Sequence, residues 1–242
     1  VHSAKQQVVR IDRETDWPLP AEVARAFAAQ LLPALADCDA VLLSDYGSGL
    51  VTPELATAIR DTLSRRGRGG AAVPVVVDSR YRLLDYRGLT ACTPNESEVE
   101  QALGIHIDDD GDVLERAGQT LLRRTGMQAV LITRGSRGMA LFQARRPTVH
   151  VPIFGSDEVA DVTGAGDTVI ATLTTALSAG ASFEEATALA NYAGGLVVMK
   201  RGTATVSARE LAQAVARDGA GPHAPPDATP SARTRAGRRR SR

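Results

Sequence analysis

The chain has 242 residues, of which 43% are hydrophobic and only 4% aromatic, enough for one sizeable core built mainly from aliphatic side chains. Basic and acidic residues number 28 each, and the resulting net charge of +0 excludes a globally basic surface for nucleic acid. No apolar run reaches the roughly 18 residues of a membrane span, and no apolar signal-peptide region follows the first residue. A cytoplasmic location is therefore the default expectation.

Short apolar runs alternate with amphipathic segments along the chain. An alternating stretch at 6–12 indicates a first strand, and apolar runs predict strands at 40–43, 74–77, 89–93 and 129–132. A further pair, at 139–142 and 149–153, has the pattern of short antiparallel strands. Helices are expected at 20–37, 52–66, 95–103, 108–125, 166–179, 183–200 and 207–215. This order predicts an α/β fold, with a mostly parallel sheet and helices on both faces.

The last residues differ in composition from the rest of the chain. Residues 218–242 contain six arginines, two aspartates and several prolines, with few apolar side chains. Such a segment cannot bury a core, so we expect a folded domain at 1–217 and a disordered Pro/Arg-rich tail at 218–242. The tail would bind polyanions without specificity at low salt, and nothing in it indicates a specific nucleic-acid site.

Polar residues follow the predicted strands, at the edge where parallel sheets bind their ligands. They are Ser44 and Asp45, Asp78, Asn95 and Glu98, Thr133 and Gly135, and the loop 161–167. Loops are polar in general, so one such strand end would be weak evidence. Five strand ends that bring polar groups to one edge are typical of a binding site.

The loop Asp161-Val162-Thr163-Gly164-Ala165-Gly166-Asp167 leads directly into a helix of small apolar residues. Gly164 and Gly166 permit positive φ angles and the close approach of a ligand. The first N–H groups of the helix, together with its dipole, form an anion site. Asp167 then has two interpretations: it is the N-cap of the helix, or it takes the proton of a hydroxyl that attacks a bound phosphoryl group.

The segment Asn95-Glu96-Ser97-Glu98 also has two interpretations. An Asn at the N-cap with a Glu three residues later forms a capping box. Alternatively, the two side chains act on Mg²⁺ through its bound waters, since Mg²⁺ prefers oxygen ligands and keeps several waters. The sequence contains neither G-x-x-x-x-G-K-[ST] nor a strand followed by G-x-G-x-x-G, which excludes a P-loop and a dinucleotide fingerprint.

Together these motifs resemble those of the ribokinase-like (PfkB) carbohydrate kinases. The 161–171 segment is similar to the C-terminal signature of that family, 95–98 to its N-x-x-E segment, and 133–138 to its nucleotide-binding strand end. A narrower resemblance, over about residues 5–217, is to the kinase domain of the D-glycero-D-manno-heptose 7-phosphate kinase / ADP-heptose synthase proteins. It is carried by the segments 44–47, 93–95, 161–172 and 200–207.

The resemblance implies a ribokinase-like fold and an ATP-dependent transfer to a sugar hydroxyl, most specifically the anomeric hydroxyl of a heptose 7-phosphate. It implies Asp167 as the base and an anion hole made by Gly164, Ala165 and Gly166. The implied ATP-binding residues are Asn95, Glu96, Ser97, Glu98, Thr133, Gly135 and Asn191. Asn191 could equally be an ordinary residue of a helix surface.

The resemblance also implies Mg²⁺, held by Asn95 and Glu98 through water, and a monovalent cation at Asp161 and Thr163. Asp45 could face the sugar, although an Asx turn is an equally good interpretation. The implied partners are a sugar phosphate and ATP, and the full-length protein is expected to form a homodimer because relatives often dimerise through a β-lid.

Three departures from the family pattern keep alternatives open. From the resemblance, we expect the sequence to begin after the opening strands, the glycine-rich sugar-binding segment and the β-lid of the family, and to lack the nucleotidyltransferase domain. Asp78-Ser79-Arg80 stands where the heptose kinases tend to carry Asp-Pro-Lys, and Ser48 stands where they tend to carry Lys. A kinase for another sugar or a nucleoside, and an inactive nucleotide-binding remnant, therefore remain alternatives.

Overall fold

The computed structural model describes residues 2–3, 6–7, 19–65, 72–108, 110–155, 162–200 and 202–219. Its centre is a six-stranded sheet with the order β3-β4-β5-β6-β7-β8. The strands are β3 (Val41–Asp45), β4 (Val75–Ser79), β5 (Ala91–Cys92), β6 (Ala129–Thr133), β7 (Met139–Gln143) and β8 (Val149–Val151). Strands β3 to β6 are parallel, whereas β7 and β8 are antiparallel to their neighbours, as the sequence predicts for that pair.

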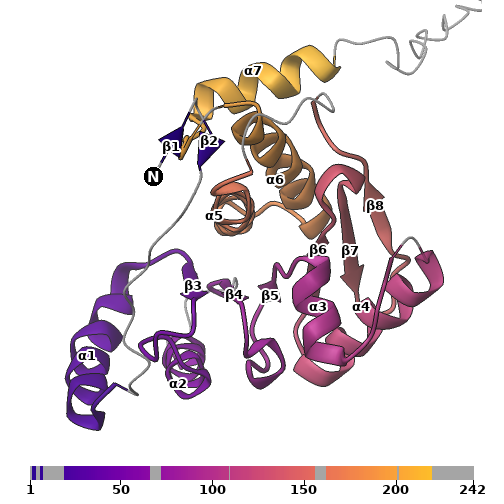
Figure 1. Cartoon of the computed structure of the whole chain (residues 1–242). Helices are drawn as coiled ribbons and strands as arrows, with labels where there is room; N and C mark the ends of the chain where they lie inside the picture. Colours follow the sequence, from indigo (N-terminus) through magenta and orange to yellow (C-terminus); the bar gives the residue numbers. More distant parts are fainter. Residues whose placement is uncertain are drawn as a thin grey trace, which may run out of the picture.

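Helices cover both faces of this sheet (Figure 1). One side carries α1 (Ala21–Ala34), α2 (Pro53–Ser64), α3 (Glu96–Leu103) and α4 (Gly111–Thr125). The other side carries α5 (Ala165–Ser178) and α6 (Phe183–Val198), and α7 (Ala208–Gly219) packs on α6. Three short 3₁₀ helices, η1 (Leu35–Asp37), η2 (Leu83–Asp85) and η3 (Gly135–Arg137), and a small antiparallel pair, β1 (His2–Ser3) and β2 (Gln6–Gln7), complete the described elements. The predicted α/β class is confirmed.

Side chains along β4 alternate between the two faces of the sheet and so contribute to two separate parts of the core. The same alternation determines the face on which each polar residue at the strand end lies. Val75 and Val77 are buried beneath α2 and α4, whereas Val76 is buried with the residues of α5. Because side chains in a strand alternate between faces, Asp78 lies on the α5 face and Ser79 on the opposite face. The sheet therefore presents one carboxylate to the start of α5 and buries the neighbouring hydroxyl away from it.

Several predicted boundaries are wrong by a few residues. Helix α4 begins at Gly111 rather than 108, because the Asp110 carboxylate caps it and accepts the N–H groups of Asp112 and Val113. Strand β5 covers only Ala91–Cys92 rather than 89–93, since Pro94 has no N–H for a ladder. Helix α5 begins at Ala165, one residue earlier than expected.

Two expectations concern the ends of the chain. The strand predicted at 6–12 overlaps β2, and its remainder lies outside the described residues. Helix α7 continues to Gly219, beyond both the expected helix end at 215 and the expected domain end at 217, and residues 220–242 lie outside the described residues. None of the described helices combines the length and the apolar composition that a membrane crossing needs.

Candidate active site

Polar side chains from four parallel strands meet the start of α5 at the carboxyl edge of the sheet. Ser44 of β3 stands in register with Asp78 of β4. The N–H of Thr93, just after β5, donates to the carbonyl oxygen that precedes Asp78, at 3.3 Å. Asn95 in turn forms a bridge with Thr133 at the end of β6. The parallel register thus aligns these groups across the sheet, as the sequence predicts for such strand ends.

Two adjoining polar cavities lie along this edge. The first, of about 160 Å³, is lined by Tyr46, Asp78, Thr93, Asn95, Glu98, Thr133, Gly164, Gly166 and Asp167. The second, of about 180 Å³, is lined by Ser44, Asp45, Tyr46, Asp78, Arg80, Asn95 and Glu98. Because the two share four residues, they form one polar trough between the sheet edge and α5, and we refer to them below as the α5 cavity and the Arg80 cavity.

The start of α5 is built from glycine and has no side-chain cap. Its N-cap is Gly164, with φ +78° and ψ 6°, a left-handed conformation that other residues adopt only with strain. The Ala165 N–H already donates to the Val162 carbonyl at 3.2 Å, so of the three residues predicted to form an anion hole only Gly164 and Gly166 line the cavity. Asp167 is the third residue of the helix, and the interpretation as N-cap is wrong.

Asp167 is held by a tyrosine from a distant part of the chain. The Tyr46 hydroxyl donates to Asp167 Oδ1 at 2.8 Å, across 121 positions of sequence. Both side chains line the α5 cavity. The hydrogen bond to Asp167 is the largest cause that raises the pKa of the Tyr46 phenol, so Tyr46 remains protonated and donates at neutral pH. This contact is not predicted from the sequence.

The Asp45 carboxylate is engaged on both oxygens, and its side chain is only 5% exposed. Oδ2 accepts the Ser79 hydroxyl at 2.9 Å and the Tyr86 hydroxyl at 2.7 Å, and Oδ1 accepts the Gly47 N–H at 2.9 Å. Burial and the contact with Asp45 raise the pKa of the Tyr86 phenol, which therefore stays a donor. The last of these bonds is the predicted Asx turn, and the geometry favours it over a sugar contact.

Asn95 and Glu98 form the predicted capping box at the start of α3 and also line both cavities. Asn95 Oδ1 accepts the Glu98 N–H at 2.9 Å, and Glu98 Oε2 accepts the Asn95 N–H at the same distance. Burial raises the pKa of Glu98, which its contacts with Asn95 and the nearby Arg80 lower in part. The two predicted roles therefore coincide in space, because the capping geometry presents both side chains to the trough.

Other predicted nucleotide-binding residues lie outside the residues that line the trough. Glu96 forms an ion pair with Arg134, at 2.8 Å from Nε, and a second one with Arg137. These pairs hold η3 against α3. Gly135, the first residue of η3, has φ +57° and lies just after the end of β6. Ser97 is exposed on the first turn of α3.

Asn191 is not the helix-surface residue that one interpretation expects. It is 7% exposed, and its Nδ2 donates to the Pro152 carbonyl at 2.8 Å, which ties α6 to the segment after β8. Thr163 lies two positions before the first residue of α5 and is exposed. Asp161, its predicted partner in a monovalent cation site, lies outside the described residues.

Thr93 is a site residue that was not predicted from the sequence, whereas Asp78, predicted only as one of the polar strand ends, lines the same cavity. Burial, with smaller contributions from the carboxylates of Glu98, Asp167 and Asp45, raises the pKa of Asp78 to about 7. Thr93 is 6% exposed, and its hydroxyl has no hydrogen-bond partner among the described residues. Buried polar atoms are nearly always paired, so an orphan hydroxyl at a cavity wall points to a missing ligand. Period-two counting along β4 and β5 would have placed both on the α5 face.

The donors of the trough fit a hard cation such as Mg²⁺. Asp78, Thr93, Asn95 and Glu98 offer carboxylate, hydroxyl and amide oxygens, with no sulfur or imidazole among them. No group of three or more His, Cys, Asp or Glu side chains that could hold a metal occurs in the described ranges. Burial raises the pKa values of Asp78 and Glu98, and a bound cation would favour their ionised forms.

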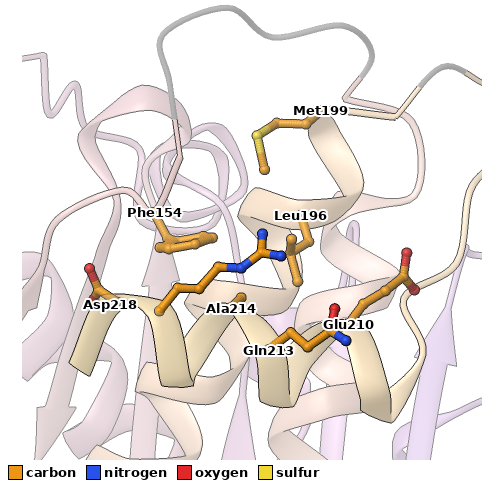
Figure 2. A pocket seen from close by; sticks show the side chains of 8 residues that line it. Phe154, Leu196, Met199, Glu210, Gln213, Ala214 and Asp218 are labelled. Carbon is orange, nitrogen blue, oxygen red and sulfur yellow. The ribbon is translucent and has the colours of Figure 1, made fainter. Parts of the chain in front are cut away.

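A larger hollow, of about 410 Å³, lies between α6 and α7, where Phe154, Leu196 and Met199 face α7 (Figure 2). At its rim, Glu210 pairs with Lys200, and Asp218 accepts the Tyr192 hydroxyl. The hollow therefore has the size of a ligand site but two of its charged side chains are engaged within the fold, whereas the smaller trough gathers carboxylate, hydroxyl and amide groups.

Comparison with curated proteins gives long, high-identity matches. The chain is 42% identical over 216 residues to the bifunctional protein HldE of Trichlorobacter lovleyi, covering 89% of this chain and 43% of that protein. It is 44% identical over 218 residues to the bifunctional protein HldE of Alkalilimnicola ehrlichii, with the same coverage of 89% and 43%. The chain thus spans less than half the length of these relatives.

Solved structures share the fold at lower identity. The ribokinase of Arabidopsis thaliana, determined with ribose and ATP, matches with a TM-score of 0.62 and 24% identity, over 76% of this chain and 58% of that chain. Phosphofructokinase-2 of Escherichia coli in complex with potassium matches with a TM-score of 0.67 and 20% identity, over 83% and 63%. The sequence model of the pfkB family carbohydrate kinases matches residues 14–210, most of the chain. The chain therefore belongs to the pfkB family of carbohydrate kinases.

Proposed function

We propose that the protein transfers the γ-phosphoryl group of ATP to a hydroxyl of a sugar phosphate. One observation carries this proposal. The start of α5, which contains glycine and has no side-chain cap, and the Asp167 carboxylate line the same cavity as a set of oxygen donors. Phosphoryl transfer asks a protein mainly for positioning and for stabilisation of charge on the transferred group. The trough supplies both kinds of group within one cavity.

In the proposed reaction, Asp167 accepts the proton of the acceptor hydroxyl as the hydroxyl oxygen forms its bond to the γ-phosphorus. The bond between that phosphorus and the bridging oxygen breaks, and ADP leaves. The N–H groups at Gly164 and Gly166 and the dipole of α5 stabilise the charge on the transferred group. Thr133, Asn95 and Glu98 lie on the facing wall and would orient the phosphates of ATP.

Magnesium would be held between this wall and the phosphates. Asn95 and Glu98 would contact it through water, and we add Asp78 and the unpartnered Thr93 hydroxyl to the donors that face it. Bound there, Mg²⁺ would neutralise charge on the phosphates. A monovalent cation at Asp161 and Thr163, and nucleotide contacts by Glu96, Ser97, Gly135 and Asn191, remain predictions.

For the acceptor we propose the anomeric hydroxyl of D-glycero-D-manno-heptose 7-phosphate. Support comes from the resemblance of segments 44–47, 93–95, 161–172 and 200–207 to the heptose kinases and from the 42% identity with an HldE protein. Another sugar, a nucleoside, or nucleotide binding without turnover are the alternatives. Those alternatives differ in the acceptor they require, so a substrate panel separates them.

The test is a coupled assay of ADP release with the complete protein, Mg·ATP, and either heptose 7-phosphate, fructose 6-phosphate, ribose or adenosine. We expect turnover with heptose 7-phosphate and a loss of roughly 10²- to 10⁴-fold in Asp167→Asn, with the thermal shift by Mg·ATP retained. Asp112→Asn, an exposed first-turn aspartate of α4, is the matched control and should be neutral. Thermal stabilisation by Mg·ATP without turnover on any acceptor would instead support the alternative that the protein binds nucleotide without catalysing a reaction.

A further inference from the structure

Tyr46 occupies a position between the two cavities of the trough, and its hydroxyl points at the proposed base. It lines both the α5 cavity and the Arg80 cavity, and its side chain is 58% exposed. An exposed tyrosine normally gains little from a fixed hydroxyl partner, yet this one donates to Asp167 Oδ1 at 2.8 Å. We propose that Tyr46 is a positioning residue that holds the Asp167 carboxylate for proton transfer, an inference that rests on the function proposed above.

The turn that carries Tyr46 is fixed from inside the protein. Asp45, on its N-terminal side, is anchored by the buried hydroxyls of Ser79 and Tyr86 and closes the turn through the Gly47 N–H. Gly47 has φ +82°, and a Cβ there would lie 2.9 Å from the Tyr81 ring, so another residue in this place would strain the turn. A rigid turn therefore carries the exposed Tyr46 side chain, which is the arrangement that a positioning residue needs.

Fixing one oxygen of a carboxylate determines where the other points. With Oδ1 accepting from Tyr46, Oδ2 of Asp167 remains to accept the proton of the acceptor hydroxyl. The charged groups that line the trough around it are Asp78 of β4, Glu98 of α3 and, in the adjoining cavity, Asp45 and Arg80. Asp78 and Glu98, which share its cavity, repel Asp167, so a neutral donor holds it without adding a charge that would compete for the phosphates.

The phenol itself gives up no proton in this scheme. Its pKa is raised, chiefly by the hydrogen bond to Asp167, so it stays a donor throughout the neutral range. The proton of the acceptor goes to Asp167 and later to solvent, and Tyr46 only orients the group that receives it.

Kinetics of Tyr46→Phe in the complete protein, with Mg·ATP and heptose 7-phosphate, test the proposal. We expect kcat to fall roughly 10- to 100-fold, the worth of a hydrogen bond to a charged group, with the KM for ATP unchanged. Tyr81→Phe, which removes the same hydroxyl from the neighbouring exposed tyrosine, should keep kcat within about twofold. In the Asp167→Asn background, Tyr46→Phe should cause no further loss, because the group it positions is gone.

A spectroscopic measurement checks the contact without relying on turnover. Isotope-labelled tyrosine, with the Tyr46 signal assigned by its loss in Tyr46→Phe, should titrate above the ordinary pKa in the wild type and closer to it in Asp167→Asn. An unchanged Tyr46 titration, a normal kcat in Tyr46→Phe, or an equal loss in both backgrounds would each overturn the positioning role. Full turnover in Asp167→Asn would instead overturn the proposed function, a result that the Tyr46 variants cannot produce.

Discussion

Helices α5 and α6 pack against each other on the same face of the sheet, yet they begin in opposite ways (Figure 1). At the start of α6, the Ser182 hydroxyl accepts the Glu185 N–H at 3.2 Å, and Glu185 accepts the Ser182 N–H at 2.8 Å. At the start of α5, Gly164 provides no side-chain acceptor. The start of α6 is therefore capped by its own side chains, whereas the start of α5 has no side-chain cap.

The start of α3 is intermediate between these two. It has a complete capping box like that of α6, but its two capping side chains line the trough like the start of α5. We expect the closed ends, the capped starts of α3 and α6, to contribute mainly to stability, and the open end, the uncapped start of α5, to contribute mainly to catalysis. Substitutions at the three ends should therefore affect different measurements.

The largest expected effect comes from filling the open end. Gly166→Val places a branched side chain where no atom lies within 4 Å of the new Cβ, so the fold should tolerate it, while the side chain enters the α5 cavity. We expect turnover to fall on the order of 100-fold or more, since small displacements of reacting groups are that costly. Activity assays and a thermal melt on the same sample measure both effects.

Gly111→Val is the matched control for that substitution, because Gly111 begins α4 and also has no atom within 4 Å of a new Cβ. It should change the melting temperature about as much as Gly166→Val and leave turnover unchanged. If Gly166→Val retained wild-type activity, the start of α5 would not be the phosphoryl site.

A second test compares the buried carboxylate with the carboxylate at the trough. Asp45→Ala leaves the Ser79 and Tyr86 hydroxyls and the Gly47 N–H without their acceptor. We expect a loss of about 3 kcal/mol in the free energy of unfolding, because bonds to a charged group are strong and the donors left behind are buried. Urea denaturation measures this loss, and a change below about 1 kcal/mol would argue against the anchoring role of Asp45.

In contrast to Asp45→Ala, Asp78→Asn should raise the free energy of unfolding. The pKa of Asp78 rises from 3.8 in the unfolded chain to about 7 in the folded one, so the folded state loses stability as the pH rises from about 4 to about 7. Replacing the carboxyl by an amide removes that loss. We expect a gain of about 2 kcal/mol at pH 8 without Mg²⁺, and almost none at pH 4, after allowance for partial solvent screening.

Thermal melts of wild type and Asp78→Asn at the two pH values check this sign. Added Mg·ATP should reduce the difference at pH 8, since a bound cation stabilises the ionised carboxyl of the wild type only. An equal effect of the substitution at both pH values would show that Asp78 is not destabilised by its ionisation.

The sequence predicted the order of the elements and the edge at which the site lies, because apolar periodicity and parallel topology are local or general properties. It could not predict that Tyr46 reaches Asp167, since that contact joins a turn after β3 to α5 and depends on how both pack on the sheet. The position of Thr93 in the site could have been predicted, because the face of the sheet on which it lies follows from counting along β5.

Two further misses have different physical causes. The alternative interpretation of Asp167 as an N-cap was wrong because helix starts are uncertain by a residue or two, and Gly164 with its positive φ takes that place. The burial of Asn191 was hidden because α6 carries small and apolar residues nearly all round, including Gly194 and Gly195, so its sequence does not show which face is covered.

The smallest effect, and the one that completes the comparison, is expected at the closed end. Ser182→Ala removes the acceptor of the Glu185 N–H and should cost about 1 kcal/mol in the free energy of unfolding, as N-cap substitutions generally do. Turnover should stay within twofold of the wild type, because Ser182 does not line the trough. Urea denaturation and the ADP-release assay give the two values. A loss of turnover without a loss of stability would mean that α6 also positions the site, and the division between closed and open helix starts would no longer hold.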